Sequence, residues 1–305
     1  MTALNRLQLT YAANIASPMP DTQDLRIGIG RQRVAFGDQR FVGNVAWRQH
    51  EQTLDGITLN NTSIPGLNLN YAYVTRVNRV FGPDSPIGTF DSHSHLFNAA
   101  YRGLPYVRLE AFAYLLDLRQ SAAQSTETFG FRADGTIPLG SGVNGILNGG
   151  YSWQGAYAKN PNSVDLSYYV GEAGFGYKGA TALIGYEVLE GNGIAGFSTP
   201  LATLHIFQGW ADVFLTTPAN GIKDFYAKAA YTLPVPPLFT NVTATAFYHD
   251  FSAERISGSF GHEWDVQVEG AVDTHVTVGA KFAAFQGGSL YPDKNVGWLY
   301  VGYRF

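Results

Sequence analysis

Apolar and polar side chains alternate with a period of two along most of the chain. In the last segment, residues 295–305, one row of alternate positions is apolar and aromatic: Leu299, Val301, Tyr303 and Phe305. An extended strand places such a row on one face and the residues between them on the other. The segment therefore predicts a strand with one apolar face and one wetter face, and we expect the rest of the chain to be a series of similar strands.

The same alternation predicts about 15 strands in all. Strands are expected around residues 4–13, 24–33, 66–77, 106–118, 125–134, 143–157, 166–178 and 180–190, and the clearest are the later ones at 224–232, 263–269 and 275–282. Short links are expected at 103–105, 138–142, 179, 234–240 and 273, and long loops at 31–57, 78–94 and 191–222. Short and long links alternate, as periplasmic turns and outer loops do in outer-membrane barrels.

The predicted fold class is therefore all-β: a transmembrane, antiparallel, up-and-down β-barrel of about 14–18 strands that forms a single domain over residues 1–305. Single-chain bacterial barrels have an even number of strands, so an odd count predicts at least one further strand upstream. The residues after Met1 lack the basic and apolar regions of a secretory signal, which indicates a longer precursor.

Composition agrees with this interpretation. The chain has 305 residues, 35 Gly, 14% aromatic and 14% charged residues, a mixture too aromatic for a disordered protein. No run of about 18 apolar residues exists, which excludes a transmembrane helix. Cysteine is absent, so no disulfide is expected, and the net charge of −4 gives no reason to expect a nucleic acid as a partner.

Five stretches, spread over most of the chain, resemble the alginate-export family of outer-membrane porins: residues 31–57, 69–82, 91–103, 199–221 and 248–255. The resemblance implies a channel in the bacterial outer membrane, surrounded by lipid, that carries an anionic uronate polysaccharide through an arginine-rich lumen. The chain departs from the family in two ways. The upstream strands are missing, and the inner row of one late strand is acidic.

Six basic residues fall on the rows predicted to face the lumen: Arg26, Arg76, Arg102, Arg108, Arg132 and Lys228. A basic wall attracts anions, and arginine suits carboxylates because its planar group donates two parallel hydrogen bonds. The alternative is that these residues only neutralise inner carboxylates such as Glu110, Glu172 and Glu187.

An acidic ladder of Glu263, Asp265 and Glu269 lies on one late strand. It either faces the basic wall, which would create a field across the pore, or pairs with Lys281 on the next strand. Either arrangement weakens a pure selectivity for anions.

The 191–222 segment is too long for an ordinary connection, and its aromatic residues argue against free solvation. We expect it to fold into the barrel and narrow the pore with Phe207, Trp210 and Phe214, and residues 31–50 could do the same. The alternative is an outer cap with no gating role.

An enzyme is an alternative to a channel, because Asp91, His93, Ser94 and His95 are clustered in a predicted loop and His249 adjoins Asp250. Members of a catalytic triad are brought together by the fold and are seldom sequence neighbours. His93 and His95 lack further metal ligands at a useful spacing. We therefore expect no catalytic residue, metal or cofactor, and a passive channel for polar solutes with a preference for anions. A barrel hydrolase and a closed structural barrel are the alternatives, and the sequence does not indicate an oligomeric state.

Overall fold

Alternating side chains build one long antiparallel sheet. The computed structural model describes residues 5–15, 23–48, 50–235 and 237–304, which form fifteen strands that neighbour one another in sequence order. The strands are β1 (Leu7–Ala13), β2 (Leu25–Gln32), β3 (Thr53–Asn61), β4 (Leu67–Asn78), β5 (Thr89–Leu104), β6 (Val107–Leu115), β7 (Thr126–Gly140), β8 (Val143–Ala156), β9 (Asp165–Tyr177), β10 (Ala180–Leu189), β11 (Ile222–Val235), β12 (Phe239–Ser252), β13 (Ser259–Ala271), β14 (Val276–Gly287) and β15 (Lys294–Tyr303).

Helix is nearly absent from the described residues. The two short 3-10 helices are η1 (Arg119–Gln124) and η2 (Leu204–Ile206). Neither of these, nor any other described helix, has the length and apolar character needed to cross a membrane.

The chain divides into two compact units. The first unit comprises residues 1–133, 150–168 and 197–204, and the second comprises residues 134–149, 169–196 and 205–305. The prediction of a single domain over residues 1–305 stays a prediction.

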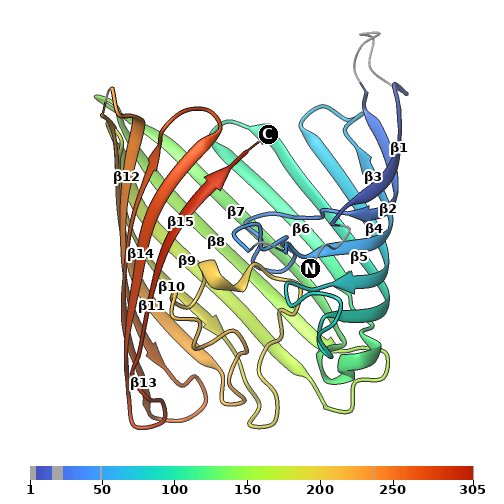
Figure 1. Cartoon of the computed structure of the whole chain (residues 1–305). Coiled ribbons are helices and arrows are strands. Elements are labelled where there is room, and N and C mark those ends of the chain that lie inside the picture. Colours follow the sequence, from blue (N-terminus) through green and yellow to red (C-terminus); the bar gives the residue numbers. More distant parts are fainter. Residues whose placement is uncertain (1–4, 16–22, 49, 236, 305) are drawn as a thin grey trace. The chain divides into compact units, whose positions relative to one another are not determined.

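In the first unit, β2 to β6 run side by side (Figure 1). One face of this sheet, which we call the covered face, packs against loop residues of the 33–52 and 197–204 segments through a core that includes Val42, Leu96 and Leu201. The other face, which we call the open face, carries exposed apolar side chains such as Ile29, Ile57 and Phe97. The two faces follow the alternation in the sequence.

In the second unit, β10 to β15 run side by side (Figure 1), and this sheet also has an open and a covered face. Its open face is apolar, and Leu299 and Val301 are 89% and 74% exposed. Its covered face packs against loop residues that include Trp210 and Phe214. The apolar rows predicted from the sequence are therefore uncovered, as a lipid-facing surface requires. Phe305, which was included in the predicted terminal row, lies outside the described residues.

Connections alternate between short and long, as predicted. Short turns at 62–66, 105–106, 141–142, 178–179 and 272–275 alternate with longer connections at 33–52, 79–88, 116–125, 157–164, 190–221, 253–258 and 288–293. The predicted short link at 234–240, between β11 and β12, includes residue 236, which lies outside the described residues. We refer to the two ends of the strands as the short-turn end and the long-loop end.

The structure corrects two predicted loops. Residues 53–57 belong to β3, and residues 89–94 belong to β5. In β5, Phe90, Ser92 and Ser94 are buried on the covered face while Asp91 and His93 lie on the open face. The Pro and Gly residues at 83–88 obscured this alternation, because they lie directly before the strand begins.

Candidate functional site

Four asparagine side chains form a connected polar chain on the covered face of the first unit. Asn60, Asn70 and Asn98 are register partners on β3, β4 and β5, so their side chains lie next to one another. Asn60 Nδ2 donates to Asn68 Oδ1 at 2.6 Å and to Asn70 Oδ1 at 2.7 Å. Asn70 Nδ2 donates to Asn98 Oδ1 at 3.4 Å. We call these four residues the amide ladder.

The amide ladder ends on a buried carboxylate. Asn98 Nδ2 donates to Glu110 Oε1 at 2.5 Å and to the Tyr114 hydroxyl at 3.3 Å. Arg108 donates a short hydrogen bond to the other oxygen of Glu110. Glu110 therefore accepts from both an amide and a guanidinium, which satisfies this carboxylate in its buried position.

A cavity of about 480 Å³ opens beside the ladder and is lined by Asn68, Asn70, Asn98, Arg102 and Arg108. Arg102 is exposed and makes no ion pair with any described residue. Arg108, in contrast, is already paired with Glu110. The cavity thus offers one guanidinium and several amides to a solute, which is a suitable set of donors for a carboxylate that also carries hydroxyl groups.

The 33–52 loop folds onto the covered face at the edge of this cavity. Arg40 is 1% exposed, its Nη1 donates to Thr199 Oγ1 at 3.5 Å, and its guanidinium lies 5.5 Å from the centre of the Tyr168 ring. Phe41 packs against Phe112, with 4.8 Å between ring centroids. Asp38 forms an ion pair with Arg132 at 3.0 Å. This loop therefore lies against the covered face, and narrowing of the pore by residues 31–50 stays a prediction.

In the second unit, two carboxylates of the acidic ladder accept hydrogen bonds from the backbone of a loop. Glu263 Oε1 accepts from the backbone N–H of Ala211 at 2.6 Å, and Asp265 Oδ2 accepts from that of Trp210 at 3.1 Å. Both carboxylates are fully buried. Gly209 has a φ of +80°, and a Cβ there would lie 2.5 Å from Glu263 Oε2. We call residues 205–215 the anchored segment.

Aromatic packing adds to this attachment. Trp210 and Phe214 are buried, and the Phe214 ring lies 4.8 Å from that of Phe251. Phe207 is half-buried. The predicted inward folding of this segment thus agrees with its position on the covered face of the second unit, and a role in narrowing the pore stays a prediction.

Lys281, the alternative partner of the acidic ladder, makes its short contacts with other groups. Lys281 Nζ lies 2.7 Å from His205 Nε2 and 3.7 Å from the centre of the Trp210 ring, and it forms no ion pair with a described carboxylate. Glu269 accepts a hydrogen bond from the Tyr300 hydroxyl at 2.7 Å. Sequence reasoning missed the backbone N–H partners of Glu263 and Asp265, for which Gly209 was the only signal.

Most of the predicted basic residues lie on covered faces. Arg26 is the register partner of Asn60, and Arg102 and Arg108 line the cavity. Arg132 is paired with Asp38. In the second unit, Lys228 Nζ lies 5.0 Å from the centre of the Phe247 ring. The structure brings Arg102 and Arg108 together at one cavity.

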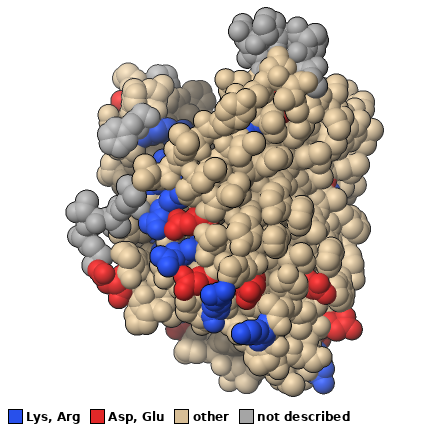
Figure 2. Space-filling view, turned by 90° about the vertical axis from the view of Figure 1, so that its right-hand side faces the viewer, with Lys and Arg blue, Asp and Glu red and all other residues tan. Residues whose placement is uncertain are grey.

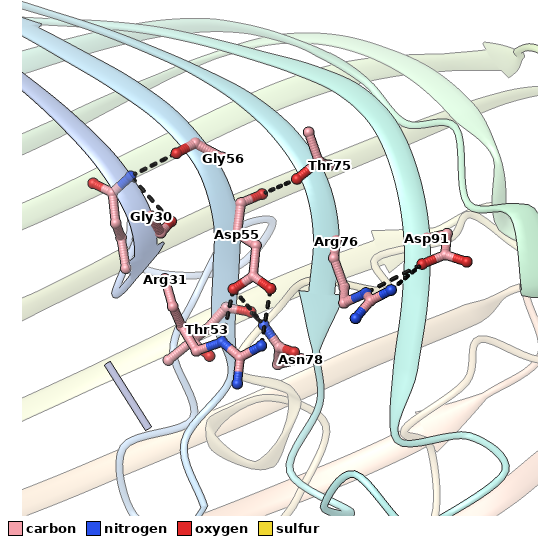
Figure 3. Close-up of polar contacts among 10 residues, drawn as sticks. Gly30, Arg31, Thr53, Asp55, Gly56, Thr75, Arg76, Asn78 and Asp91 are labelled. Atoms are coloured by element: carbon pink, nitrogen blue, oxygen red, sulfur yellow. Dashed lines mark hydrogen bonds and ion pairs between the residues drawn. The ribbon is translucent and has the colours of Figure 1, made fainter. Parts of the chain in front are cut away.

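Arg76 is an exception, and its assignment to the lumen is wrong. A register shift between Val74 and Arg76 inserts one extra residue in β4, which moves Arg76 to the open face. Its Nη2 contacts Asp91 Oδ1 at 3.0 Å, and its side chain is 49% exposed (Figure 3). The next residue, Val77, is fully buried on the covered face.

The candidate catalytic residues Asp91, His93, Ser94 and His95 are divided between the two faces of β5. His93 and His95 are on the open face, where their Nδ1 atoms contact the hydroxyls of Tyr73 at 2.8 Å and Tyr71 at 2.9 Å. Ser94 is buried on the covered face and bonds to Ser92. These residues do not form a triad. The described residues also contain no group of three or more His, Asp or Glu side chains that could hold a metal ion.

No protein-family model matches the sequence, and no curated protein matches it. Several solved structures do match. OccAB4 from Acinetobacter baumannii has a TM-score of 0.73 and 15% identity over 92% of this chain and 72% of its own. OccK3 (OpdO) from Pseudomonas aeruginosa has a TM-score of 0.72 and 13% identity over 92% and 76%. OpdK from Pseudomonas aeruginosa, whose structure was solved with vanillate, has a TM-score of 0.67 and 17% identity over 92% and 76%.

These similar structures are outer-membrane porins. At this level of identity the similarity concerns the fold, so the chain has the all-β, antiparallel, up-and-down fold of bacterial outer-membrane porin barrels. The predicted fold class is confirmed. None of the three is named for alginate export, and the resemblance to that family stays a prediction.

Proposed function

We propose that the chain is a channel of the bacterial outer membrane that passes polar solutes. Exposed apolar rows on the open faces suit lipid, and polar side chains on the covered faces suit an aqueous path. The fold that the chain shares with the Occ and Opd porins supports this proposal. A channel of this kind needs no cofactor and no catalytic residue.

The favoured solutes are small organic anions. The observation that carries this part of the proposal is the cavity of about 480 Å³ in which the exposed Arg102 stands beside the amide ladder. An arginine without an ionic partner attracts a carboxylate, and amide groups bind hydroxyls through both their donors and their acceptors. OpdK, solved with vanillate, offers a precedent for an aromatic carboxylate in this fold.

A uronate oligosaccharide is the narrower form of the same proposal. Each uronate unit has one carboxylate and several hydroxyls, which match Arg102 and the amide ladder in kind. Its support is the resemblance of five sequence stretches to the alginate-export family, so we keep it as a hypothesis subordinate to the anion channel.

Reversal potentials in planar bilayers test the proposal. Purified protein in a tenfold KCl gradient is expected to show a preference for chloride, and Arg102→Gln is expected to reduce that preference because it removes the unpaired charge at the cavity. Lys178→Gln, in the β9–β10 turn of the second unit, is the matched control for loss of one positive charge. Clear cation selectivity of the unmodified protein, or the absence of any conductance, would refute the anion channel.

A further inference from the structure

Four charges of alternating sign lie side by side on the open face of the first unit. Arg31, Asp55, Arg76 and Asp91 are successive register partners across β2, β3, β4 and β5. Arg31 donates to both oxygens of Asp55, through Nε at 2.7 Å and Nη2 at 2.9 Å. Arg76 contacts Asp91 through Nε at 3.1 Å and Nη2 at 3.0 Å (Figure 3). We call these four residues the charge row.

A second group of donors lies next to the charge row. Arg119 Nη2 contacts His93 Nε2, and His93 Nδ1 contacts the Tyr73 hydroxyl. A guanidinium can only donate, so Nε2 accepts and the proton of a neutral imidazole lies on Nδ1, from which it is donated to Tyr73. The hydroxyl proton of Tyr73 is then available to another acceptor. Arg119 is exposed and forms no ion pair with a described residue.

The position of the charge row along the strands indicates the level of the membrane at which it lies. Arg31 is the penultimate residue of β2, Asp91 is near the start of β5, and Arg119 is in the connection after β6, so all lie at the long-loop end. Figure 2 shows charged side chains gathered toward one end of this side of the molecule, beside a broad area that has none. A charge on the lipid face is costly at the middle of a bilayer and nearly free of cost at its interface. The row therefore suits the level of the headgroups.

Long loops of outer-membrane barrels are extracellular, so this level is that of the outer leaflet. The three arginines Arg31, Arg76 and Arg119 outnumber the two aspartates, and Arg76 Nη1 donates no hydrogen bond to a described residue. Guanidinium groups match phosphate in geometry as well as charge.

We propose that Arg76, Arg119 and Tyr73 bind a phosphate group of an outer-leaflet lipid headgroup, with the charge row holding Arg76 in place. The proposal relies on the proposed membrane location but not on anion conduction. It assigns a lipid-binding function to a face of the sheet that carries none of the solute-binding residues.

Lipid binding by the purified full chain tests this inference. Native mass spectrometry is performed from detergent micelles that contain lipid A, which carries two phosphates, or dephosphorylated lipid A. We expect retention of lipid A and weak retention of the dephosphorylated form. Arg76→Gln and Arg119→Gln are each expected to weaken retention about fivefold, from the roughly 1 kcal/mol that one basic residue contributes near an anionic lipid surface. Lys178→Gln at the short-turn end is the matched control and is expected to have no effect.

Three outcomes would overturn the inference: equal retention of the dephosphorylated lipid, unchanged retention in the Arg76→Gln/Arg119→Gln double variant, or equal stabilisation by inorganic phosphate without lipid. Arg76→Lys keeps the charge but loses the planar group, and a partial loss of retention by this well-folded variant would support phosphate geometry. A change of oligomer mass instead of lipid retention would identify a second copy as the partner and also overturn the proposal. A double variant that loses lipid but keeps anion selectivity would leave the channel proposal intact.

Discussion

Gly209 is the point at which a single methyl group should weaken the attachment of the anchored segment. At a φ of +80°, a residue with a Cβ is strained by about 1–2 kcal/mol. The added Cβ would also lie 2.5 Å from Glu263 Oε2 and 2.6 Å from its Cδ. Glu263 is buried and must move, which breaks its hydrogen bond from Ala211 and costs a further ~1.5–3 kcal/mol. Gly209→Ala is thus expected to destabilise the attachment by about 2.5–5 kcal/mol.

The attachment that remains is of similar size. Release of the segment would expose Trp210 and Phe214 at a cost of about 1.5–3 kcal/mol each. Apolar burial alone therefore contributes about 3–6 kcal/mol to the attachment, in addition to the hydrogen bonds with the carboxylates. Because the hydrogen bond to Glu263 is not part of this amount, only the strain of about 1–2 kcal/mol is subtracted from it. Gly209→Ala is therefore expected to weaken the attachment but leave the segment mostly attached, whereas Gly209→Ala/Trp210→Ala should bring the attached and released forms close to balance.

Hydrogen exchange of residues 205–215 measures this release directly, and single-channel conductance measures its effect on the pore. We expect faster exchange and a higher or noisier current in Gly209→Ala. Gly82→Ala is the matched control, because Gly82 has a φ of +82° but no heavy atom within 4 Å of its ideal Cβ position. If a folded Gly209→Ala protein shows the same protection of this segment as Gly82→Ala, the anchoring argument fails.

Two further predictions concern stability and insertion. Burial opposes ionisation of Glu51, but hydrogen bonds from Arg33 and Asn44 outweigh this effect and lower the pKa of Glu51. The ionised carboxylate therefore stabilises the fold fully above about pH 5, and this stabilisation is lost as the pH falls through the lowered pKa. Melting curves of Glu51→Gln should lack this pH-dependent contribution. Equal acid sensitivity of both proteins would contradict this. Val266→Arg, on the open face of β13, is expected to cost about 2–4 kcal/mol in folding into lipid vesicles, as measured by gel mobility of folded and unfolded protein, whereas Thr245→Arg on the covered face should insert normally. Equal insertion of the two variants would show that the open face does not meet lipid.

Period-two alternation was sufficient to predict the strands, because each strand has one apolar and one polar row. It correctly predicted β13 and β15 and the alternation of short and long connections. It failed at Arg76, because a single extra residue in β4 reverses the faces and leaves no mark in the pattern of residue types.

The candidate site was harder to predict than the strands. Arg102 and Arg108 share one cavity, as their common row suggested, but that cavity also depends on loop residues 35–37, which come from a distant part of the sequence. Glu263 and Asp265 bind backbone N–H groups more than fifty positions away, and every residue except proline has such a group, so no residue type identifies the partner.

The direction of the amide ladder has a consequence for solutes. Ionised Glu110 can only accept, so Asn98 presents its NH₂ to Glu110 and its oxygen to Asn70, and the same orientation passes along to Asn60. The carboxylate at the end of the ladder thereby determines which amide atoms on three neighbouring strands donate hydrogen bonds and which accept them. A passing sugar would meet amides that all have the same fixed orientation, and removal of the negative charge of Glu110 would allow each amide group to flip.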